Sequence, residues 1–523
     1  MIRRRSVIRF CQTWWPLCIS ILALVVFYVV FTWSAPLYVL DGDDSVYVAM
    51  AEYFSPFSSD RNPAIVQLVM RNAAFPPLYP FMLGLVGADP WHLEFAHLLT
   101  VSFLISALLV YAWWIKTETK SVFQATALMV LFAVCPATLL QSLRILSENL
   151  YLLLSLTTAL AIAFAARSRF WWYVAAVCAG LCTVTRSVGV TVVLAFIIYV
   201  FIHKNPRRWW LALISVAPMA TWMVFKKVAG FHRSYIHVFD GGILNTILSP
   251  QRLAELIQNQ SKAIWFGWLT TFDFHPSTVT FVVASILGVL CIGGWLYRLR
   301  HRRFDAIYIT LYIGVIIVWP FPSEMTRFLF VIVPMLLFYG FQFAGLMASR
   351  LDSALLSKAI AIGYIAVIAF VLLPPVGFIA TRALAASPDG NRFSPAWYVR
   401  SDINLASRRV RDDQYLIDAW SRVRKFVPEN ECVYHIKPVP FMLFANRMSY
   451  APPNARDVES FLAQANQCRF YYVTSYTSFP YDDAFYPMAY LLGAHILDVE
   501  YAIDIPQRPT LGILVEYDKS WKR

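Results

Sequence analysis

Long apolar runs alternate with short polar segments over most of the first 380 residues of the chain. Eleven of these runs have the roughly 20 residues that an α-helix needs to cross a bilayer, or nearly so. The pattern predicts an α-helical polytopic membrane protein with about eleven transmembrane helices. The runs cover residues 15–33, 93–115, 121–140, 147–166, 171–185, 188–203, 209–225, 277–297, 304–320, 327–347 and 357–380.

Residues 171–203 form one long apolar stretch that is interrupted only by Thr185-Arg186-Ser187. A charged side chain within a membrane is costly unless it faces water or a partner. We therefore predict two short helices joined by a tight turn that carries Arg186.

The composition supports a membrane protein and excludes several other classes. Of the 523 residues, 59% are hydrophobic and 14% are charged, whereas soluble domains carry about 25% charged residues. A soluble protein of this size could not cover so much apolar surface with so few charges. A soluble enzyme, a disordered chain and a secreted disulfide scaffold are thereby excluded.

The net charge of +13 is distributed in a way that indicates topology rather than nucleic-acid binding. Basic residues cluster in short segments between apolar runs, as the positive-inside rule describes, and not on one face of a water-exposed domain. An odd number of spans then places the N-terminus inside and the C-terminus outside. The first run lacks a small-residue cleavage site, so we expect a retained anchor. The clusters are Arg3–Arg5, Lys116 with Lys120, Arg167 with Arg169, Lys204 with Arg207 and Arg208, and Arg298–Arg303.

This topology leaves three large segments on the outer side: 34–92, 226–276 and 381–523. We expect a transmembrane domain over 1–380, with the first two segments as its outer loops. The tail 381–523 gains charge and proline and alternates helix with strand, which predicts a small extracytoplasmic α/β domain. Its expected elements are a helix at Asp413–Phe426, a strand at Cys432–Ile436, a turn at Lys437–Pro440, a helix at Ala455–Ala465, and strands at Arg469–Thr474 and Leu511–Glu516.

Cys432 and Cys468 each lie at the start of a predicted strand of the tail. If the two strands are parallel neighbours, the thiols come close together. A disulfide between them is a hypothesis at this point. The remaining cysteines lie in or near apolar runs, where thiols act as apolar filler.

The strongest candidate for chemistry is an acidic trio, Asp41, Asp43 and Asp44, directly after the first run. A carboxylate at a helix N-terminus is stabilised as the ion, and it can act as a general base or bind a divalent metal. The alternative is simple helix capping, which needs only one such residue. The apolar residues that follow predict an amphipathic helix at the membrane interface, with a stripe of Val46, Ala49, Met50, Tyr53 and Phe54.

Two further groups stand out. Phe75-Pro76-Pro77-Leu78-Tyr79-Pro80-Phe81 contains three prolines in five residues, which predicts a stiff loop. The second group consists of ionisable residues at the outer ends of spans, where arginine suits a phosphate because its fork donates two parallel hydrogen bonds. The alternative is snorkelling or a local Arg–Glu pair. These residues are Arg144, Glu148, Arg186, Glu324 and Arg327.

Several motifs are absent from the sequence. It contains no Gly-rich P-loop and no dinucleotide-binding fingerprint, so nothing in it supports a nucleotide-driven mechanism. It also contains no H-E-x-x-H and no His/Cys spacing typical of a zinc site.

Taken in order, these residues resemble the polytopic glycosyltransferases of the GT-C type, in particular the family 39-like group of aminoarabinose transferases and protein mannosyltransferases. The resemblance extends over most of the chain. The sequence differs from the family pattern at two positions. Asp44 stands in place of the usual Glu, and Phe75 stands in place of a basic residue, a role that Arg71 takes instead. The matching elements are Asp43-Asp44-Ser45-Val46-Tyr47 with Ala51, Pro76-Pro77-Leu78-Tyr79, Ser147-Glu148, Gly180-Leu181 with Arg186, Arg327 with Pro334, Lys437-Pro438 and Asn446-Arg447.

The resemblance implies an enzyme at the outer face of the membrane, by analogy a bacterial inner membrane. Such an enzyme moves a sugar, with inversion, from a polyprenyl-phosphate donor to a hydroxyl of a lipid, polysaccharide or protein acceptor. It implies Asp43 as the general base and Asp44 as the second acid. It leaves a divalent metal open, with these two carboxylates as its ligands if one binds. The substrate-binding residues that it implies are Tyr47, Arg71, Tyr79, Arg144, Glu148, Arg186, Arg327, Lys437 and Arg447.

Two other functions are compatible with a membrane protein of this kind. A transporter or lipid flippase would need polar groups near mid-membrane and broken helices at matching positions, of which the sequence indicates only the interruption at Arg186. A non-catalytic scaffold with a sensing tail would tolerate neutralisation of the acidic trio.

Overall fold

The computed structural model divides into two compact units. The first unit contains Met1–Trp33, Ala74–Tyr79 and His97–Ala385. The second contains Ser34–Ala73, Pro80–Ala96 and Ala386–Arg523. The first outer loop is therefore grouped with the tail, and this division differs from a single boundary near residue 380. The structure describes residues 2–33, 43–57, 61–72, 74–231, 249–319, 321–350, 354–386, 395–453, 464, 466–474, 495–501 and 510–516.

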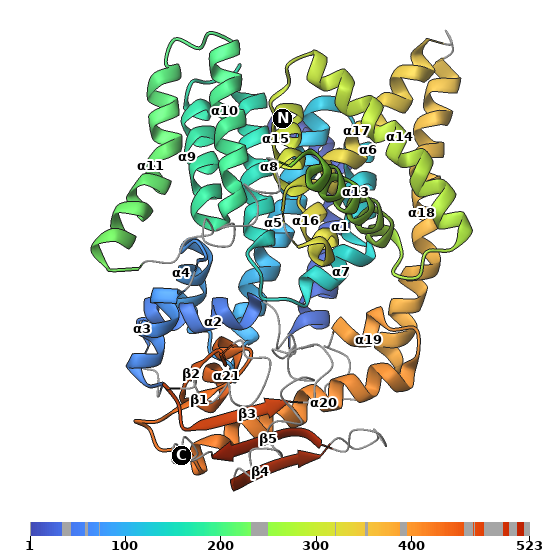
Figure 1. The fold of residues 1–523 in the computed structure, drawn as a ribbon. Coiled ribbons are helices and arrows are strands. Elements are labelled where there is room, and N and C mark those ends of the chain that lie inside the picture. Colours follow the sequence, from blue (N-terminus) through green and yellow to red (C-terminus); the bar gives the residue numbers. More distant parts are fainter. Residues whose placement is uncertain are drawn as a thin grey trace. The chain divides into compact units, whose positions relative to one another are not determined.

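The first unit is built from apolar helices that run side by side (Figure 1). Every apolar run predicted from the sequence lies on one or two of them. Their bounds are α1 Ile2–Thr32, α5 Glu94–Thr119, α6 Val122–Ala133, α7 Pro136–Ser142, α8 Glu148–Phe164, α9 Phe170–Thr185, η1 Ser187–Gly189, α10 Val190–Ile202, α11 Arg208–Val228, α13 Pro250–Phe272, α14 Thr278–Arg300, α15 Phe304–Ile317, η3 Pro322–Glu324, α16 Met325–Phe330, α17 Val333–Ser349 and α18 Ala354–Ala385.

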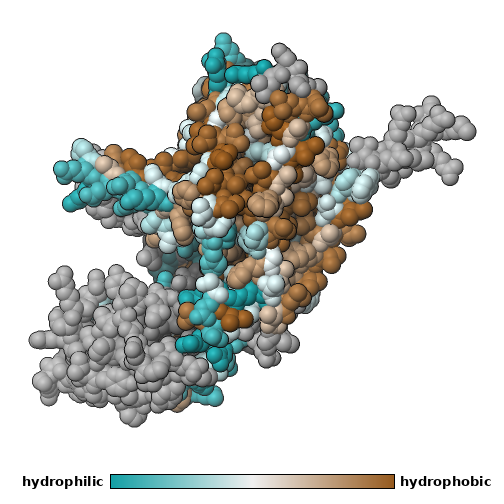
Figure 2. Space-filling model, turned by 90° about the vertical axis from the view of Figure 1, so that its right-hand side faces the viewer, coloured by the Kyte–Doolittle hydropathy of each residue, from teal (hydrophilic) through white to brown (hydrophobic). Residues whose placement is uncertain are grey.

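The chain is an integral membrane protein. Among the described residues, five helices are long and apolar enough to cross a bilayer, and seven spans result if each of two bent helix pairs counts as one. Figure 2 shows apolar side chains gathered over α14 and α18, where Ile286, Val289, Phe370 and Leu373 are exposed, as expected of a lipid-facing surface. Four further apolar helices are shorter, so the count of about eleven spans stays a prediction.

Two of the predicted spans are broken. Helix α7 is bent by 66° relative to α6, and α17 is bent by 66° relative to the η3–α16 segment. A proline lies in the first turn of the second helix of each pair, Pro136 in α7 and Pro334 in α17. Proline is accommodated there because the first N–H groups of a helix have no intrahelical acceptor.

The basic cluster Arg298–Arg303 contains a buried arginine. Arg298 is buried, and its guanidinium donates to both carboxylate oxygens of Asp305, at 2.6 and 2.9 Å. It also reaches Glu118 at 3.2 Å, and the Tyr339 hydroxyl donates to Asp305 at 2.6 Å. These contacts tie α5, α14, α15 and α17 together, which adds a structural role to the topological one expected for this cluster.

The second unit combines helices with one five-stranded sheet of order β2-β1-β3-β5-β4 (Figure 1). Strand β1 is parallel to β2 and β3, whereas β5 is antiparallel to β3 and β4. The bounds are α2 Asp43–Phe54, α3 Pro63–Asn72, α4 Leu78–Leu85, α19 Pro395–Val399, α20 Ile403–Arg422, η5 Val423–Lys425, β1 Cys432–Tyr434, α21 Pro438–Ala445, β2 Met448–Tyr450, β3 Phe470–Thr474, β4 His495–Tyr501 and β5 Thr510–Glu516.

An aromatic cluster forms part of the core of this unit. The His435 ring stacks on Phe441 with centroids 4.9 Å apart, and the Trp420 ring meets His435 edge to face, also at 4.9 Å. Tyr472 of β3 closes the cluster, 5.7 Å from Phe441. Aromatic packing of this geometry joins α20, α21 and the sheet.

One prediction for the tail is wrong. The predicted turn at Lys437–Pro440 is instead the start of helix α21 at Pro438, because prolines fit the first turn of a helix as readily as they fit a loop. The strands at Cys432–Ile436, Arg469–Thr474 and Leu511–Glu516 correspond to β1, β3 and β5. The helix predicted at Ala455–Ala465 lies almost entirely outside the described residues.

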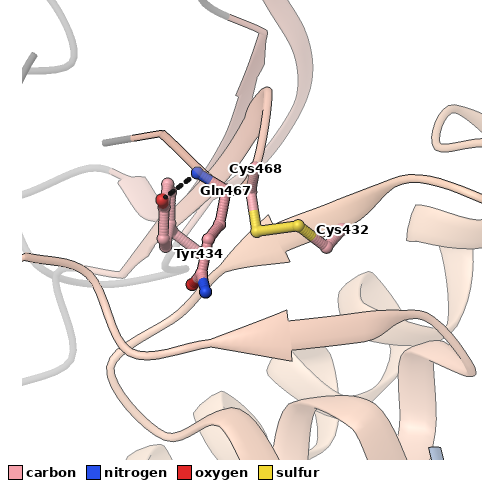
Figure 3. Close-up of a disulfide and its surroundings, with 4 residues drawn as sticks. All are labelled: Cys432, Tyr434, Gln467 and Cys468. Carbon is pink, nitrogen blue, oxygen red and sulfur yellow. Dashed lines mark hydrogen bonds between the residues drawn. A yellow bond between two sulfur atoms is a disulfide. The ribbon is translucent and has the colours of Figure 1, made fainter. Parts of the chain in front are cut away.

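Cys432 and Cys468 form a disulfide, with their Cα atoms 4.9 Å apart (Figure 3). The parallel pairing of β1 with β3 brings the two segments together, as the hypothesis from the sequence requires. Beside the bond, the backbone N–H of Gln467 donates to the Tyr434 hydroxyl at 2.9 Å (Figure 3). The disulfide and this hydrogen bond both join the segment before β3 to β1.

Candidate functional site

A buried ion cluster in the first unit joins three of the residues expected to bind substrate. Glu148 is the first residue of α8 and has no exposed surface. Its Oε1 atom accepts from Arg186 and from Arg327. The two arginine side chains are 11% and 10% exposed. The structure therefore brings together Glu148, Arg186 and Arg327 in one constellation.

Each of the three residues lies where a helix is interrupted. Arg186 has an extended backbone between α9 and η1, as predicted for the turn. Arg327 lies in α16, the short helix before the bend into α17, and Glu148 follows the loop after α7. Non-helical backbone at membrane depth is tolerated where it is buried in protein or lines a cavity. Broken spans are therefore the positions at which polar side chains can converge.

The turn at Arg186 depends on a glycine. The Arg186 carbonyl accepts from the N–H of Gly189 at 2.8 Å. A Cβ at Gly189 would lie 2.2 Å from the carbonyl oxygen of Cys182, so any side chain there would displace the turn from the end of α9. A substitution at Gly189 would thereby shift Arg186.

In the buried part of the cluster, two guanidinium groups share one carboxylate oxygen. Arg186 also donates to the Ser147 hydroxyl, at 3.3 Å. Glu324 approaches Arg327 at 3.7 Å, but its side chain is 42% exposed and water screens it. The pairing with Glu148 matches the local-pair alternative, while two neighbouring guanidinium groups are also the donors that suit an anion such as a phosphate.

Tyr79, the second residue of α4, is fully buried and belongs to the first unit, whereas α4 from Pro80 onward belongs to the second. Its hydroxyl is hydrogen-bonded to the Thr100 hydroxyl at 2.8 Å, and Asn149, the residue after Glu148, reaches the Thr100 carbonyl at 3.5 Å. The prediction of a loop over residues 75–81 is wrong from Leu78 onward, because α4 begins there. Pro80 occupies the first turn of that helix, where its missing N–H has no consequence.

The acidic residues open a helix of the second unit. Asp43 and Asp44 are the first two residues of α2. Asp43 is half-buried, and Asp44 is only 4% exposed. Asp41 lies outside the described residues. Carboxylates in the first turn of a helix are stabilised by its unpaired N–H groups.

Helix α2 is buried more completely than the predicted stripe requires. Tyr47, Val48 and Ala51 are buried as well, whereas Val46 is only half-buried. The buried surface is thus wider than the stripe, of which Ala49 and Met50 are buried, because α3 and α21 cover other sides of the helix. Helix α4 also lies against it, since a Cβ at Gly84 would be 2.5 Å from the Ala51 carbonyl oxygen.

The remaining expected substrate-binding residues lie on other segments of the two units. Arg71 is exposed in the last turn of α3, and Arg144 is half-buried in the loop before α8. Lys437 is the residue before α21. Arg447 donates to the carbonyls of Val427, Asn446 and Arg424, at 2.6, 2.9 and 3.0 Å, and burial lowers the pKa of its guanidinium.

The structure adds one residue that the sequence did not single out. The Tyr312 hydroxyl donates to the Phe328 carbonyl at 2.8 Å, and Tyr312 interacts electrostatically with Arg186, Glu148 and Arg327. A single tyrosine in an apolar run carries no periodic or spacing signal, so only the fold identifies it. Over the described ranges, no group of three or more His, Cys, Asp or Glu residues could hold a metal ion.

The sequence matches no protein-family model and no curated protein. Similar folds are found among solved structures. ArnT from Cupriavidus metallidurans in the apo state is 12% identical with a TM-score of 0.52, and the match covers 98% of this chain and 99% of that chain. ArnT bound to undecaprenyl phosphate has a TM-score of 0.50 at 12% identity, covering 96% and 98%. The apo oligosaccharyltransferase of Archaeoglobus fulgidus has a TM-score of 0.50 at 13% identity, covering 96% and 74%.

One of these neighbours is an oligosaccharyltransferase, and one of the ArnT structures contains undecaprenyl phosphate. The likeness extends over nearly the whole chain, so the GT-C resemblance found in the sequence is confirmed at the level of the fold. A common fold does not by itself determine function, which has to be argued from the residues of the site.

Proposed function

We propose that this protein is a membrane glycosyltransferase that moves a sugar from a polyprenyl-phosphate donor to an acceptor hydroxyl at the outer face of the membrane. The observation that carries the proposal is the cluster of Glu148, Arg186 and Arg327 at three helix interruptions. Two arginines meet at one carboxylate oxygen in a largely buried environment, and guanidinium groups bind phosphate through parallel hydrogen bonds. A lipid phosphate is an anion that reaches such a place from within the bilayer.

The cluster suits the departure of a phosphate. When the bond between the anomeric carbon and the phosphate oxygen breaks, its electron pair leaves with the lipid phosphate, and negative charge grows there. Guanidinium groups that are already held in place stabilise this charge without reorganising. Glu148 holds Arg186 and Arg327 in this role and keeps two like charges close together.

Asp43 is the general base in the proposed reaction. It takes the proton from the acceptor hydroxyl while the acceptor oxygen forms a bond to the anomeric carbon from the face opposite the phosphate, which inverts the configuration. Its half-buried position in the first turn of α2 supports this role, because part of the carboxylate stays accessible to an acceptor. Asp44 is the second acid, for the acceptor or for a divalent metal if one binds.

The proposed location is a bacterial inner membrane, with the N-terminus in the cytoplasm and the C-terminus outside. The basic clusters between spans support this orientation. A lipid-linked donor also accounts for the lack of a nucleotide-binding motif in the sequence. ArnT and the archaeal oligosaccharyltransferase share this fold, and one ArnT structure contains undecaprenyl phosphate.

The test uses the purified protein in lipid nanodiscs with a panel of polyprenyl-phosphate sugars. We expect release of lipid phosphate from at least one donor, and this release should depend on Asp43 and Arg327. The absence of release from every donor of the panel, with the wild-type protein folded, would overturn the proposal.

A transporter or flippase is the second candidate, and the structure adds an observation in its favour. The helices bend by 66° at α6–α7 and at α16–α17, and each bend marks a broken span or a re-entrant loop. Broken helices are typical of transporters, and the sequence indicated neither bend. The same protein reconstituted into vesicles separates the two functions. Movement of the sugar lipid across the vesicle membrane without cleavage supports transport, whereas cleavage supports transfer.

A further inference from the structure

The loop after α2 contains an arginine that no motif had singled out. The Arg61 side chain is 8% exposed, and its Nε lies 2.5 Å from Oε2 of Glu52, which is 4% exposed. Glu52 lies in the last turn of α2, the helix that begins with Asp43. A buried ion pair therefore joins this loop to the acidic helix.

The same guanidinium reaches the end of another helix of the second unit. Its Nη1 donates to the carbonyls of Met442 and Leu443, at 3.1 and 2.6 Å, across 381 and 382 positions of the chain. These carbonyls belong to the last turn of α21, where the helix dipole favours a cation, and the Met442 carbonyl also accepts from the Asn446 N–H at 3.1 Å. Arg61 is thus a C-terminal cap for α21.

A second contact reinforces the first. The backbone N–H of Asn62 donates to the side-chain oxygen of Asn446 at 3.1 Å. Asn446 adopts a left-handed conformation at the end of α21, which asparagine tolerates better than most residues. Neighbouring residues 61 and 62 therefore both bind the terminus of the same helix.

Through these contacts Arg61 links α21 to α2. A helix is stiff over three turns, so a restraint at Glu52 also limits the orientation of Asp43 at the other end. The Trp91 ring, which meets Phe444 of α21 edge to face at 5.5 Å, adds a contact from another segment of the same unit.

We propose that Arg61 is a positioning residue, which uses α21 of the tail to orient the α2 carboxylates for the reaction. This inference rests on the proposed role of Asp43 as the base. It also gives the tail a function, because the tail supplies the surface that holds α2.

The test compares Arg61→Met with a matched control, Arg424→Met. Methionine retains an apolar stem but no donor, and Arg424 is an exposed arginine of the same unit. We expect kcat for lipid-phosphate release to fall by about 10- to 10²-fold in Arg61→Met, as for a displaced catalytic group, while KM for the lipid donor stays within about twofold. The control should keep both constants.

Hydrogen exchange of the amides of residues 43–54 provides a readout that does not need turnover. We expect faster exchange over this range in Arg61→Met and unchanged exchange in the control. Unchanged exchange in Arg61→Met would overturn the positioning role. A fall in kcat that merely follows the folded fraction, measured by size-exclusion chromatography, would also overturn it.

A milder variant covers the case in which Arg61→Met does not fold. Glu52→Gln removes the ion pair but leaves the hydrogen bonds from Arg61 to α21. It should lower kcat and speed up exchange over residues 43–54, both by less than Arg61→Met does. If the wild type releases no lipid phosphate but exchange over 43–54 responds to Arg61, then the proposed function fails while the link between α21 and α2 stands.

Discussion

Arg327 donates from Nε to Oε1 of Glu148, although the two residues lie 179 positions apart in the chain. Arg186 pairs with the same oxygen atom. One buried carboxylate is therefore the common partner of two arginines. Substitution of Glu148 should affect mainly stability, whereas substitution of an arginine should affect mainly activity.

Glu148→Gln should destabilise the protein strongly. Without the carboxylate, two largely buried guanidinium groups lose the charge partner that they share, and breaking a buried pair in this way costs about 3–5 kcal/mol. Thermal unfolding in detergent, followed by size-exclusion chromatography, measures the change. The control is Glu324→Gln, whose exposed carboxylate should contribute about 0–1 kcal/mol. Equal midpoints for the two variants would contradict the assignment.

Arg327→Lys should fold but transfer poorly. Lysine keeps the charge but lacks the planar fork that serves Glu148 and a phosphate together. The rate of lipid-phosphate release should fall by about 10²-fold, the typical effect of losing a donor that stabilises developing charge. Arg300→Lys, at an exposed position in α14, is the matched control and should release at the wild-type rate. Comparable rates for both variants would remove Arg327 from the phosphate site.

Asp43→Asn should abolish transfer and leave the fold intact. The variant is nearly isosteric at a half-buried position, and the loss of a general base lowers a rate by about 10²–10⁴-fold. Asp44→Asn should instead lower the unfolding midpoint as well, because Asp44 is buried. Single-turnover assays with matched unfolding curves separate the two effects. Near-normal turnover of Asp43→Asn would exclude Asp43 as the base.

Acid should destabilise the second unit through His435. Burial lowers the pKa of this imidazole to about 3, from 6.5. Between these values the unfolded chain binds a proton that the folded chain does not, so the free energy of unfolding decreases as the pH falls below about 6.5. We expect His435→Phe to lose part of the drop in unfolding midpoint between pH 7.5 and pH 5. The control variant His301→Gln, at an exposed position, should show the whole drop in unfolding midpoint.

Removal of the Cys432–Cys468 bond should destabilise the sheet. The bond closes a loop of 36 residues. Because its removal increases the entropy of the unfolded chain, the free energy of unfolding should fall by about 2–4 kcal/mol. The double variant Cys432→Ser/Cys468→Ser should unfold at a lower temperature under oxidising conditions and match the reduced wild type. Peptide mass spectrometry without reduction checks the bond itself, and two free thiols in the native protein would refute it.

Much of the fold was predictable because the signals are local. The eleven apolar runs and the turn at Arg186 follow from hydropathy over about 20 residues, and β1 and β3 follow from short stretches of strand-forming residues. The errors are local ambiguities. The prolines at Pro80 and Pro438 fit a loop and a first helical turn equally well, and burial on several sides of α2 depends on distant segments.

The candidate site was predictable in its members but not in its arrangement. The sequence indicated Glu148, Arg186 and Arg327 separately, as charges at the ends of spans. It did not indicate that both arginines share one oxygen of Glu148, nor that Asp43 and Asp44 belong to a compact unit with the tail.

The sequence by itself determined that this is a membrane protein, where its long apolar helices lie and which side chains are chemically notable. These properties depend on each residue and its near neighbours. Only the tertiary structure decided which charges meet, that Arg298 is buried among Asp305 and Glu118, and that Arg61 caps a helix 381 positions away. The physical reason is that such contacts are made after the helices pack, between segments whose separation along the chain leaves no periodic trace.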